Sequence, residues 1–256
     1  FHDGNSSESI FELQYDDIIQ FNWVLRDIFG YYGNEAGQWS FPNVLVTGKS
    51  SPFGYQAGST RESVEDLRQK DFLRPELGGD KYYVFKYAGA LRQENSAGYS
   101  SYIYRNTTAN WIVYRLSEII LMKAEALIQL ENNNELALEL INTTYLRSNP
   151  DLLGEGLKIE DYNSKKELEN LLYRERQREL MFEGKRWFAL MRLARRANTP
   201  EPLLSYVLKK YTGTASAQAS KMSVMDALYL PVHSDELKAN SALEQNTYYE
   251  LTGEED

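Results

Sequence analysis

The clearest hydrophobic pattern lies in the middle of the chain. Between Asn110 and Leu130 apolar residues recur every three or four positions, which is the spacing of one face of an α-helix. Further apolar residues such as Leu121 and Met122 widen that face, so we predict a helix that is buried on most sides. The polar run ENNN follows, and Asn134 is placed to cap a second helix. The pattern therefore predicts a helical hairpin with TPR-like proportions.

A third helix is predicted from a start signal. Ser164 and Glu167 have the spacing of a capping box, in which each side chain bonds to the backbone of the other residue. We expect this helix to run as far as Gly184 and to end or bend there. Residues Lys185–Arg196 are again helical in pattern, and a turn of helix is expected from Ser234.

The first part of the chain has little helical periodicity. Residues 1–58 are rich in Gly, Ser, Asn and aromatic residues, as in GYYGNEAGQWSFPN from Gly30 to Asn43. Long loops of this kind are uncommon in compact domains unless they have a function. We expect a short helix capped by Ser59 and a possible strand within Lys81–Gly89, and we expect the run GTASAQAS further along the chain to be an exposed loop.

These patterns predict a mainly α fold of TPR-like α-α hairpins with a large irregular, loop-rich portion. We expect one domain over residues 1–256, in which residues 1–110 form a loop-rich, ligand-facing part and residues 111–256 form the helical body.

Composition excludes several classes of protein. The net charge of −9 argues against non-specific binding of nucleic acid, which requires a basic surface. The chain has no cysteine, so it has neither disulfides nor a thiolate metal site. No apolar run approaches the roughly 18 to 20 residues that a membrane helix needs, and the sequence, which begins with Phe1, contains no signal peptide.

Four carboxylates interrupt the apolar stripes of the predicted helices. Buried carboxylates are costly unless they are paired, and arginines are abundant in the same segments. One interpretation is a catalytic pair of acids, as in a glycoside hydrolase. We favour a structural Arg–Glu network, because nearby arginines would keep both acids ionised whereas a general acid needs a raised pKa. The residues assigned to this network are Arg115, Glu118, Glu125, Glu175, Arg178, Glu179 and Arg186.

Metal and cofactor chemistry find little support. The only histidines are His2 and His233, and no Glu-x-x-His motif is present. No P-loop and no dinucleotide fingerprint occurs. We therefore predict neither a metal site nor a cofactor.

The aromatic loops are the better candidates for binding. Rings beside side-chain amides suit a sugar, whose C–H face stacks on the ring while its hydroxyls bond to the amides. The alternative is that the rings anchor the loops on the helical body. The residues that we assign to ligand binding are Tyr31, Tyr32, Gln38, Trp39 and Phe53.

Three segments together resemble the SusD/RagB family. RLSEIILMKAEAL (Arg115–Leu127) is similar to the family run R-L-x-E-x-x-L-x-x-A-E-A. ERQRELMFEGKRWFALMR (Glu175–Arg192) is similar to E-R-x-x-E-L-x-F-E-G-x-R-x-x-D-L-x-R, with Ala189 in place of the usual Asp. YLPVHSDELKANSALEQNTYY (Tyr229–Tyr249) is similar to the family ending. The resemblance covers about residues 80 to 250.

The resemblance implies a mostly helical, TPR-like fold without catalysis. It implies a lipoprotein on the outward face of the outer membrane of a Bacteroidetes-type bacterium, where it would capture an oligosaccharide or other glycan and cap a SusC-like TonB-dependent transporter. It also implies that the chain is the carboxyl-terminal part of a longer protein, whose absent amino-terminal half would carry the lipid anchor. A TPR-like scaffold that binds a protein or peptide is the alternative.

Overall fold

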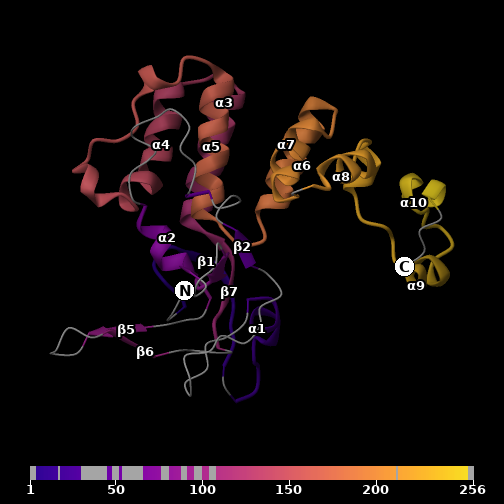
Figure 1. Cartoon of the computed structure of the whole chain (residues 1–256), viewed down its shortest axis with the longest axis horizontal. Coiled ribbons are helices and arrows are strands. Elements are labelled where there is room, and N and C mark those ends of the chain that lie inside the picture. Colours follow the sequence, from indigo (N-terminus) through magenta and orange to yellow (C-terminus); the bar gives the residue numbers. More distant parts are fainter. Residues whose placement is uncertain are drawn as a thin grey trace. The chain divides into compact units, whose positions relative to one another are not determined.

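The computed structural model of the chain describes residues 4–16, 18–29, 45–47, 52–53, 66–75, 81–87, 91–94, 100–103, 108–211 and 213–252 (Figure 1). The chain divides into two compact units, Phe1–Glu183 and Gly184–Asp256. The fold is mainly helical, as the periodicity predicted.

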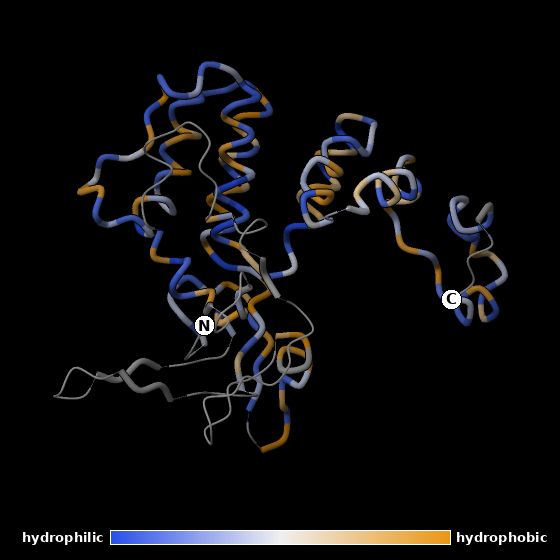
Figure 2. Tube along the Cα trace, in the orientation of Figure 1, coloured by the Kyte–Doolittle hydropathy of each residue, from blue (hydrophilic) through white to orange (hydrophobic). Residues whose placement is uncertain are grey.

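Three helices form the body of the first unit. They are α3 (Leu116–Gln129), α4 (Asn134–Arg147) and α5 (Lys165–Glu179), and orange and blue stretches alternate along each of them in Figure 2. Each helix is therefore amphipathic, and their apolar faces meet in one cluster. The cluster is built on fully buried side chains such as Leu121, Ile141 and Leu172.

The first long helix begins later than the sequence predicted. Residues Trp111–Arg115 form strand β7, which pairs antiparallel with β1 (Ser9–Leu13), and α3 begins only at Leu116. The expectation of a helix from Asn110 was therefore wrong for these five residues. The physical reason is that aromatic and β-branched residues fill this run and favour a strand when a partner satisfies their backbone groups.

Side-chain caps set the starts of the next two helices. The side chain of Asn133, not that of Asn134, accepts a hydrogen bond from the backbone N–H of Leu136 at the start of α4. The predicted capping box is confirmed at α5, where the Ser164 hydroxyl accepts from the Glu167 N–H at 3.2 Å. Two short 3-10 turns, Pro150–Leu152 and Ile159–Asp161, lie between these helices.

Helix α5 ends before the predicted position. Its last residue is Glu179, and four turn residues separate it from Gly184, whose φ of +73° lies in the left-handed region that glycine adopts without strain. The bend expected at Gly184 is present, and α6 begins two residues later, at Arg186.

Short strands and helices make up the rest of the first unit. Strands β2 (Leu45–Thr47), β3 (Leu73–Pro75) and β4 (Lys81–Val84) form an antiparallel sheet in the order β2–β4–β3. The strand expected within Lys81–Gly89 is therefore confirmed. Strands β5 (Leu91–Glu94) and β6 (Ser100–Ile103) pair with each other.

Two short helices accompany these strands, α1 (Trp23–Phe29) and α2 (Leu67–Phe72). Residue Ser59, which we expected to cap α2, lies outside the described residues. The cap that the structure does show is Asp66, whose side chain accepts from the Arg68 N–H at 3.0 Å.

A second apolar cluster lies among these strands and short helices. The ring of Tyr87 stacks between those of Phe29 and Trp111, with centroids 5.5 and 5.6 Å away, and Phe182 meets Phe29 edge-on at 5.4 Å. Because Phe182 lies in the turn that follows α5, this cluster packs the loop-rich segments near the end of that helix.

The second unit consists of short helices. They are α6 (Arg186–Ala197), α7 (Glu201–Val207), α8 (Ala215–Lys221), α9 (Ser234–Ala239) and α10 (Thr247–Thr252), with 3-10 turns at Leu208–Lys210 and Met225–Leu228. The run GTASAQAS was expected to be a loop, but most of it forms α8. Its alanines have the highest helix propensity and outweigh the serines.

Side-chain amides hold the end of the second unit together. The Gln245 amide bonds in both directions to the backbone of Val232, at 2.9 Å each way, and the Asn246 amide donates to the Asp226 carbonyl at 2.9 Å. Each amide therefore replaces the backbone partners that this short extended segment lacks. None of the helices in the described part of the chain is long and apolar enough to cross a bilayer.

Candidate functional site

Three carboxylates line one side of the end of α5. Glu175, Glu179 and Glu183 follow each other at intervals of four residues, and all three side chains are almost completely buried. Glu175 and Glu179 lie on one face of α5 because they are four residues apart, and Glu183 lies in the turn that follows, so the chain concentrates negative charge at this end of the helix. Such a group is stable only if cations surround it.

Glu175 is held from two elements. Arg68 of α2 donates to it through both terminal nitrogens, at 2.8 and 3.2 Å, and Arg178 donates through Nε at 3.1 Å. The hydroxyl of Thr144 on α4 donates a further bond at 2.7 Å. The carboxylate therefore joins α2, α4 and α5.

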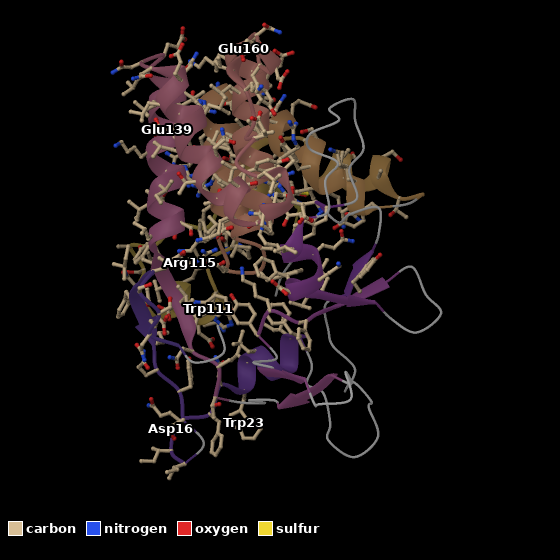
Figure 3. All side chains as sticks on the ribbon, turned by 90° about the vertical axis from the view of Figure 1, so that its left-hand side faces the viewer. Asp16, Trp23, Trp111, Arg115, Glu139 and Glu160 are labelled. Atoms are coloured by element: carbon tan, nitrogen blue, oxygen red, sulfur yellow. The ribbon has the colours of Figure 1, made fainter. Side chains whose placement is uncertain are left out.

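Glu179 and Glu183 share the guanidinium of Arg115. Its Nη1 donates to Glu179 at 2.7 Å, and its Nε and Nη2 donate to Glu183 at 2.8 Å each. Arg68 and Arg147 also reach Glu179, at 2.9 and 2.5 Å. Arg115 ends β7 and directly precedes α3, so it links the β1–β7 ribbon to α5 (Figure 3).

Lys86 completes the cluster from the segment after β4. Its ammonium group is 2.5 Å from Glu183 and also donates to the backbone carbonyls of Glu179 and Met181, at 3.2 and 3.1 Å. The first carbonyl belongs to the last residue of α5 and the second to the turn after it, where helix groups lack partners and cations are favourable. Burial lowers the pKa of Lys86 to about 8, despite the attraction of Glu183.

The other residues of the predicted network lie in different places. Glu125 accepts from the hydroxyl of Tyr173 at 3.1 Å, and Arg176 lies 4.0 Å from it. Glu118 is buried in the first turn of α3, where negative charge complements the helix dipole. The guanidinium of Arg186 lies 4.6 Å from the centre of the Tyr206 ring within the second unit.

The surroundings of Glu175 and Glu179 distinguish a catalytic pair of acids from a structural Arg–Glu network. Burial raises the pKa of Glu179, but Arg115, Arg68 and Arg147 outweigh it and bring the pKa down to about 2. The pKa of Glu175 is likewise lowered: burial raises it, and Arg68 and Arg178 overcome that effect. Buried acids that stay ionised cannot donate a proton to a leaving group, so this pair does not form the acid–base pair of a glycoside hydrolase.

Several partners in this cluster were not found from the sequence. Arg68, Lys86 and Arg147 lie in segments whose patterns give no sign that they approach α5. Glu183 could have been recognised, because it continues the interval of four that Glu175 and Glu179 begin. The cluster defined by Arg68, Lys86, Arg115, Arg147, Glu175, Glu179 and Glu183 is called the α5 ion cluster below.

Most of the predicted ligand-binding residues cannot be placed. Tyr31, Tyr32, Gln38 and Trp39 lie outside the described residues. Phe53 is half-buried and packs against the second apolar cluster. The assignment of these five residues to ligand binding therefore stays a prediction.

The described residues contain a second group of aromatic and amide side chains. It forms an open groove of about 510 Å³, and we call it the Trp23 groove. Trp23 is about half exposed, and its ring lies 5.2 Å from that of Phe21, centroid to centroid. Figure 3 shows Trp23 and Asp16 at one end of the first unit. The groove is lined by Leu13, Gln14, Tyr15, Ile19, Gln20, Phe21 and Trp23.

Hydrogen bonds fix the shape of the Trp23 groove. The Asp16 carboxylate accepts from the backbone N–H groups of Ile18, Ile19 and Gln20 at 2.6 to 3.1 Å, which closes a tight turn. These bonds, that of Ile19 first, lower the pKa of Asp16. The buried Asn110 accepts from the Tyr15 N–H at 3.1 Å and ties the groove to β7. These hydrogen bonds therefore hold the backbone around the groove in one conformation.

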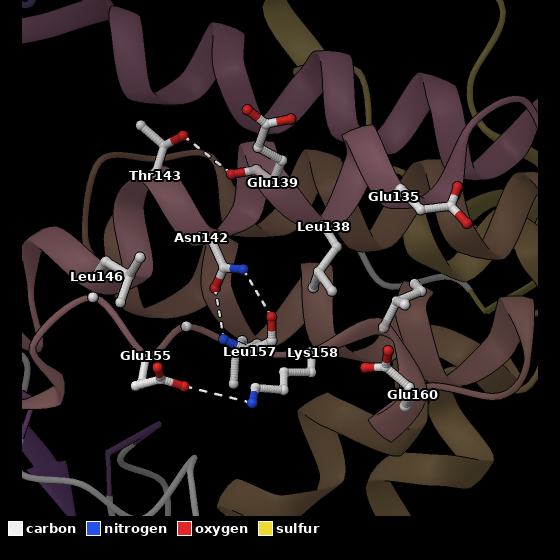
Figure 4. A pocket seen from close by; sticks show the side chains of 13 residues that line it. Glu135, Leu138, Glu139, Asn142, Thr143, Leu146, Glu155, Leu157, Lys158 and Glu160 are labelled. Carbon is white, nitrogen blue, oxygen red and sulfur yellow. Dashed lines mark hydrogen bonds and ion pairs between the residues drawn. The ribbon is translucent and has the colours of Figure 1, made fainter.

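A larger depression lies between α4 and residues 154–160 (Figure 4). It has a volume of about 710 Å³, and Asn142 fixes its base through bonds of 2.9 Å to the N–H and the carbonyl of Leu157. Glutamates dominate its rim and no aromatic ring lines it among the described residues, so it does not suit sugar stacking. In the described ranges no three His, Asp or Glu side chains come together as a metal site would require.

Residues 52–249 match the profile of the SusD family. Two SusD-like proteins of Formosa agariphila are 33% and 34% identical to the chain, over 132 and 124 residues. The alignments cover 49% and 47% of this chain, and 26% and 21% of those proteins.

Solved structures of SusD-type proteins resemble the fold of this chain. A SusD homolog from Bacteroides thetaiotaomicron superposes with a TM-score of 0.65 and 20% identity, over 96% of this chain and 48% of that structure. A SusD superfamily protein from Bacteroides vulgatus gives 0.62 and 19%, over 96% and 52%. The chain thus spans about half the length of the structures it matches.

The α5 ion cluster makes a prediction about stability. The substitution Glu175→Gln removes a fully buried charge from Arg68 and Arg178, and we expect the free energy of unfolding to fall by about 3 to 5 kcal/mol. Glu155→Gln is the matched control, because Glu155 meets Lys158 at 3.5 Å on the surface and such pairs contribute less than about 1 kcal/mol. Urea unfolding measures both, and equal effects would contradict the structural role of Glu175.

A second prediction concerns the stability of the fold at low pH. The folded pKa of Glu179, about 2, lies below its ordinary value of 4.5, so its ionised form stabilises the fold. This contribution, on the order of 3 kcal/mol, is complete above about pH 5 and is lost as the pH falls toward 2. The free energy of unfolding should decline more steeply over this range in the unmodified chain than in Glu179→Gln. Parallel pH profiles would show that Glu179 is not held ionised.

Proposed function

Because the chain belongs to the SusD family, we propose that it takes part in nutrient uptake by binding an oligosaccharide without cleaving it. In this proposal it acts at the cell surface, facing outward from the outer membrane. It passes the sugar to a SusC-like TonB-dependent transporter. A lipid anchor on the part of the protein that precedes this chain would attach it to the membrane.

Two observations together support this proposal: the chain belongs to the SusD family, and its described part contains the Trp23 groove. Sugars are bound where flat rings meet hydrogen-bonding amides in a preformed concavity. Trp23 offers a half-exposed ring beside Phe21, and Gln20 offers an exposed amide in the lining of the same groove. Residues Tyr31, Tyr32, Gln38, Trp39 and Phe53 remain proposed as further contacts, because their segment is equally rich in rings and amides.

The proposal predicts that removing a ring weakens sugar binding. In calorimetric titrations with a panel of soluble oligosaccharides, we expect Trp23→Ala and Trp39→Ala each to lower affinity about tenfold, which corresponds to 1.4 kcal/mol. Phe188→Ala is the control, since Phe188 is an exposed aromatic residue outside the groove. If only one of the two tryptophan variants loses affinity, the region around that tryptophan is the binding site.

Three outcomes would contradict the proposal. Binding that neither tryptophan variant weakens would exclude both regions as the site. New reducing ends after incubation with polysaccharides would show that the protein cleaves its ligand. Purification from outer membranes without an accompanying TonB-dependent transporter would argue against the partner that we propose.

A further inference from the structure

The Trp23 groove offers a ligand polar groups that carry no charge. Its lining contains the amides of Gln14 and Gln20 and the phenol of Tyr15, and its other members are aliphatic or aromatic. The amide of Gln14 exchanges two hydrogen bonds of 3.0 Å with that of Asn5. Gln20 is exposed, so its amide can donate to one sugar hydroxyl and accept from another. These groups therefore suit the hydroxyls of an uncharged sugar.

An ionised carboxylate stands at the turn beside this groove. Oδ1 of Asp16 lies 2.6 Å from the backbone nitrogen of Ile19 and 3.1 Å from that of Gln20, and both residues line the groove. The hydrogen bond from Ile19, followed by those from Ile18 and Gln20, lowers the pKa of Asp16, so this exposed side chain is negatively charged at neutral pH. The charge acts on a ligand in the groove, because the Debye length at physiological salt is about 8 Å.

A second carboxylate stands behind the base of the groove. Glu12 accepts from the Asn110 amide at 3.0 Å and from the Asn5 N–H at 2.9 Å, and Asn110 in turn accepts from the Tyr15 N–H at 3.1 Å. Burial raises the pKa of Glu12, but hydrogen bonds, that from Asn5 first, outweigh burial and lower the pKa. This part of the sequence is acidic throughout, since residues 1–25 contain five acidic residues and no lysine or arginine.

The charges around the groove indicate which class of sugar it takes. Acidic sugars are bound through charge-assisted hydrogen bonds from arginine or lysine, and neither residue lines the groove in the described part of the chain. We propose that the Trp23 groove selects uncharged sugars, and that the charge of Asp16 disfavours acidic ones. This inference rests on the proposed function, because it names the class of glycan that the same groove binds.

The experiment compares uncharged and acidic oligosaccharides that differ only in the oxidation of a hydroxymethyl group to a carboxylate. The probes are mannotetraose with tetramannuronate, and cellotetraose with tetraglucuronate, each pair having the same linkage. In calorimetric titrations at low salt, we expect the uncharged member to bind about tenfold more tightly than the acidic one. Added salt should narrow this difference, because it screens the repulsion between Asp16 and the acidic sugar.

The substitution Asp16→Asn separates the charge from the turn. All three N–H groups donate to Oδ1, and the asparagine side chain keeps a carbonyl oxygen that can accept these bonds. We expect the ratio of acidic to uncharged affinity to rise about threefold. Glu160→Gln is the matched control, because it removes one charge from an exposed side chain at the opposite end of the first unit (Figure 3), and the ratio should stay constant.

Four results would overturn the inference. Acidic probes could bind as tightly as their uncharged partners, or Arg26→Gln could abolish acidic binding, since Arg26 is the first arginine or lysine of the sequence. A ratio that changes in Asp16→Ala but not in Asp16→Asn would assign the effect to the turn and not to the charge. These three results leave sugar binding itself intact. A chain that binds none of the four probes would count against the proposed sugar-binding function as well.

Discussion

The first unit depends on the compensation of charge at the end of α5. Glu175, Glu179 and Glu183 would be unstable in the interior without cations. The cations come from segments far away in the sequence, with Arg68 and Lys86 from the loop-rich part and Arg115 from the junction of β7 and α3. Because breaking one partner of a buried pair leaves an unpaired charge, these segments are fixed in position relative to the helices.

The segments that identify the family contain residues that hold the fold together. Arg115 begins the first segment, and the three glutamates of α5 and its following turn lie in the second. In the third segment, the amides of Gln245 and Asn246 close the end of the second unit. The Trp23 groove, which we propose as a binding site, lies outside all three segments.

Much of the helical fold could be predicted from local signals. The apolar periodicity located α3, α4 and α5, and the Ser164 capping box located the start of α5, because both signals depend on neighbours within a few residues. Strand β7 was missed because its conformation depends on pairing with β1, about a hundred residues earlier. The length of a strand or helix that relies on such a partner cannot be inferred from its own pattern.

The candidate sites, too, could be predicted only as far as they depend on residues close together in the sequence. The sequence indicated that Glu175 and Glu179 needed cations, and it named Arg115 and Arg178 among them, but it did not name Arg68 or Lys86. Contacts between residues about a hundred positions apart follow from the fold as a whole. The Trp23 groove was likewise not singled out, since its turn is closed by Asp16 and its base by Asn110, and neither residue is remarkable by type.

Amide hydrogen exchange in Lys86→Met tests most directly whether the α5 ion cluster fixes the loop-rich part to the helices. Methionine fills similar space but removes the charge and the donors to Glu183 and to the end of α5. The account predicts faster exchange in residues 81–87 and 73–75, while the amides of α3, α4 and α5 keep their protection. Unchanged protection of residues 81–87, or equal loss throughout the three helices, would contradict it.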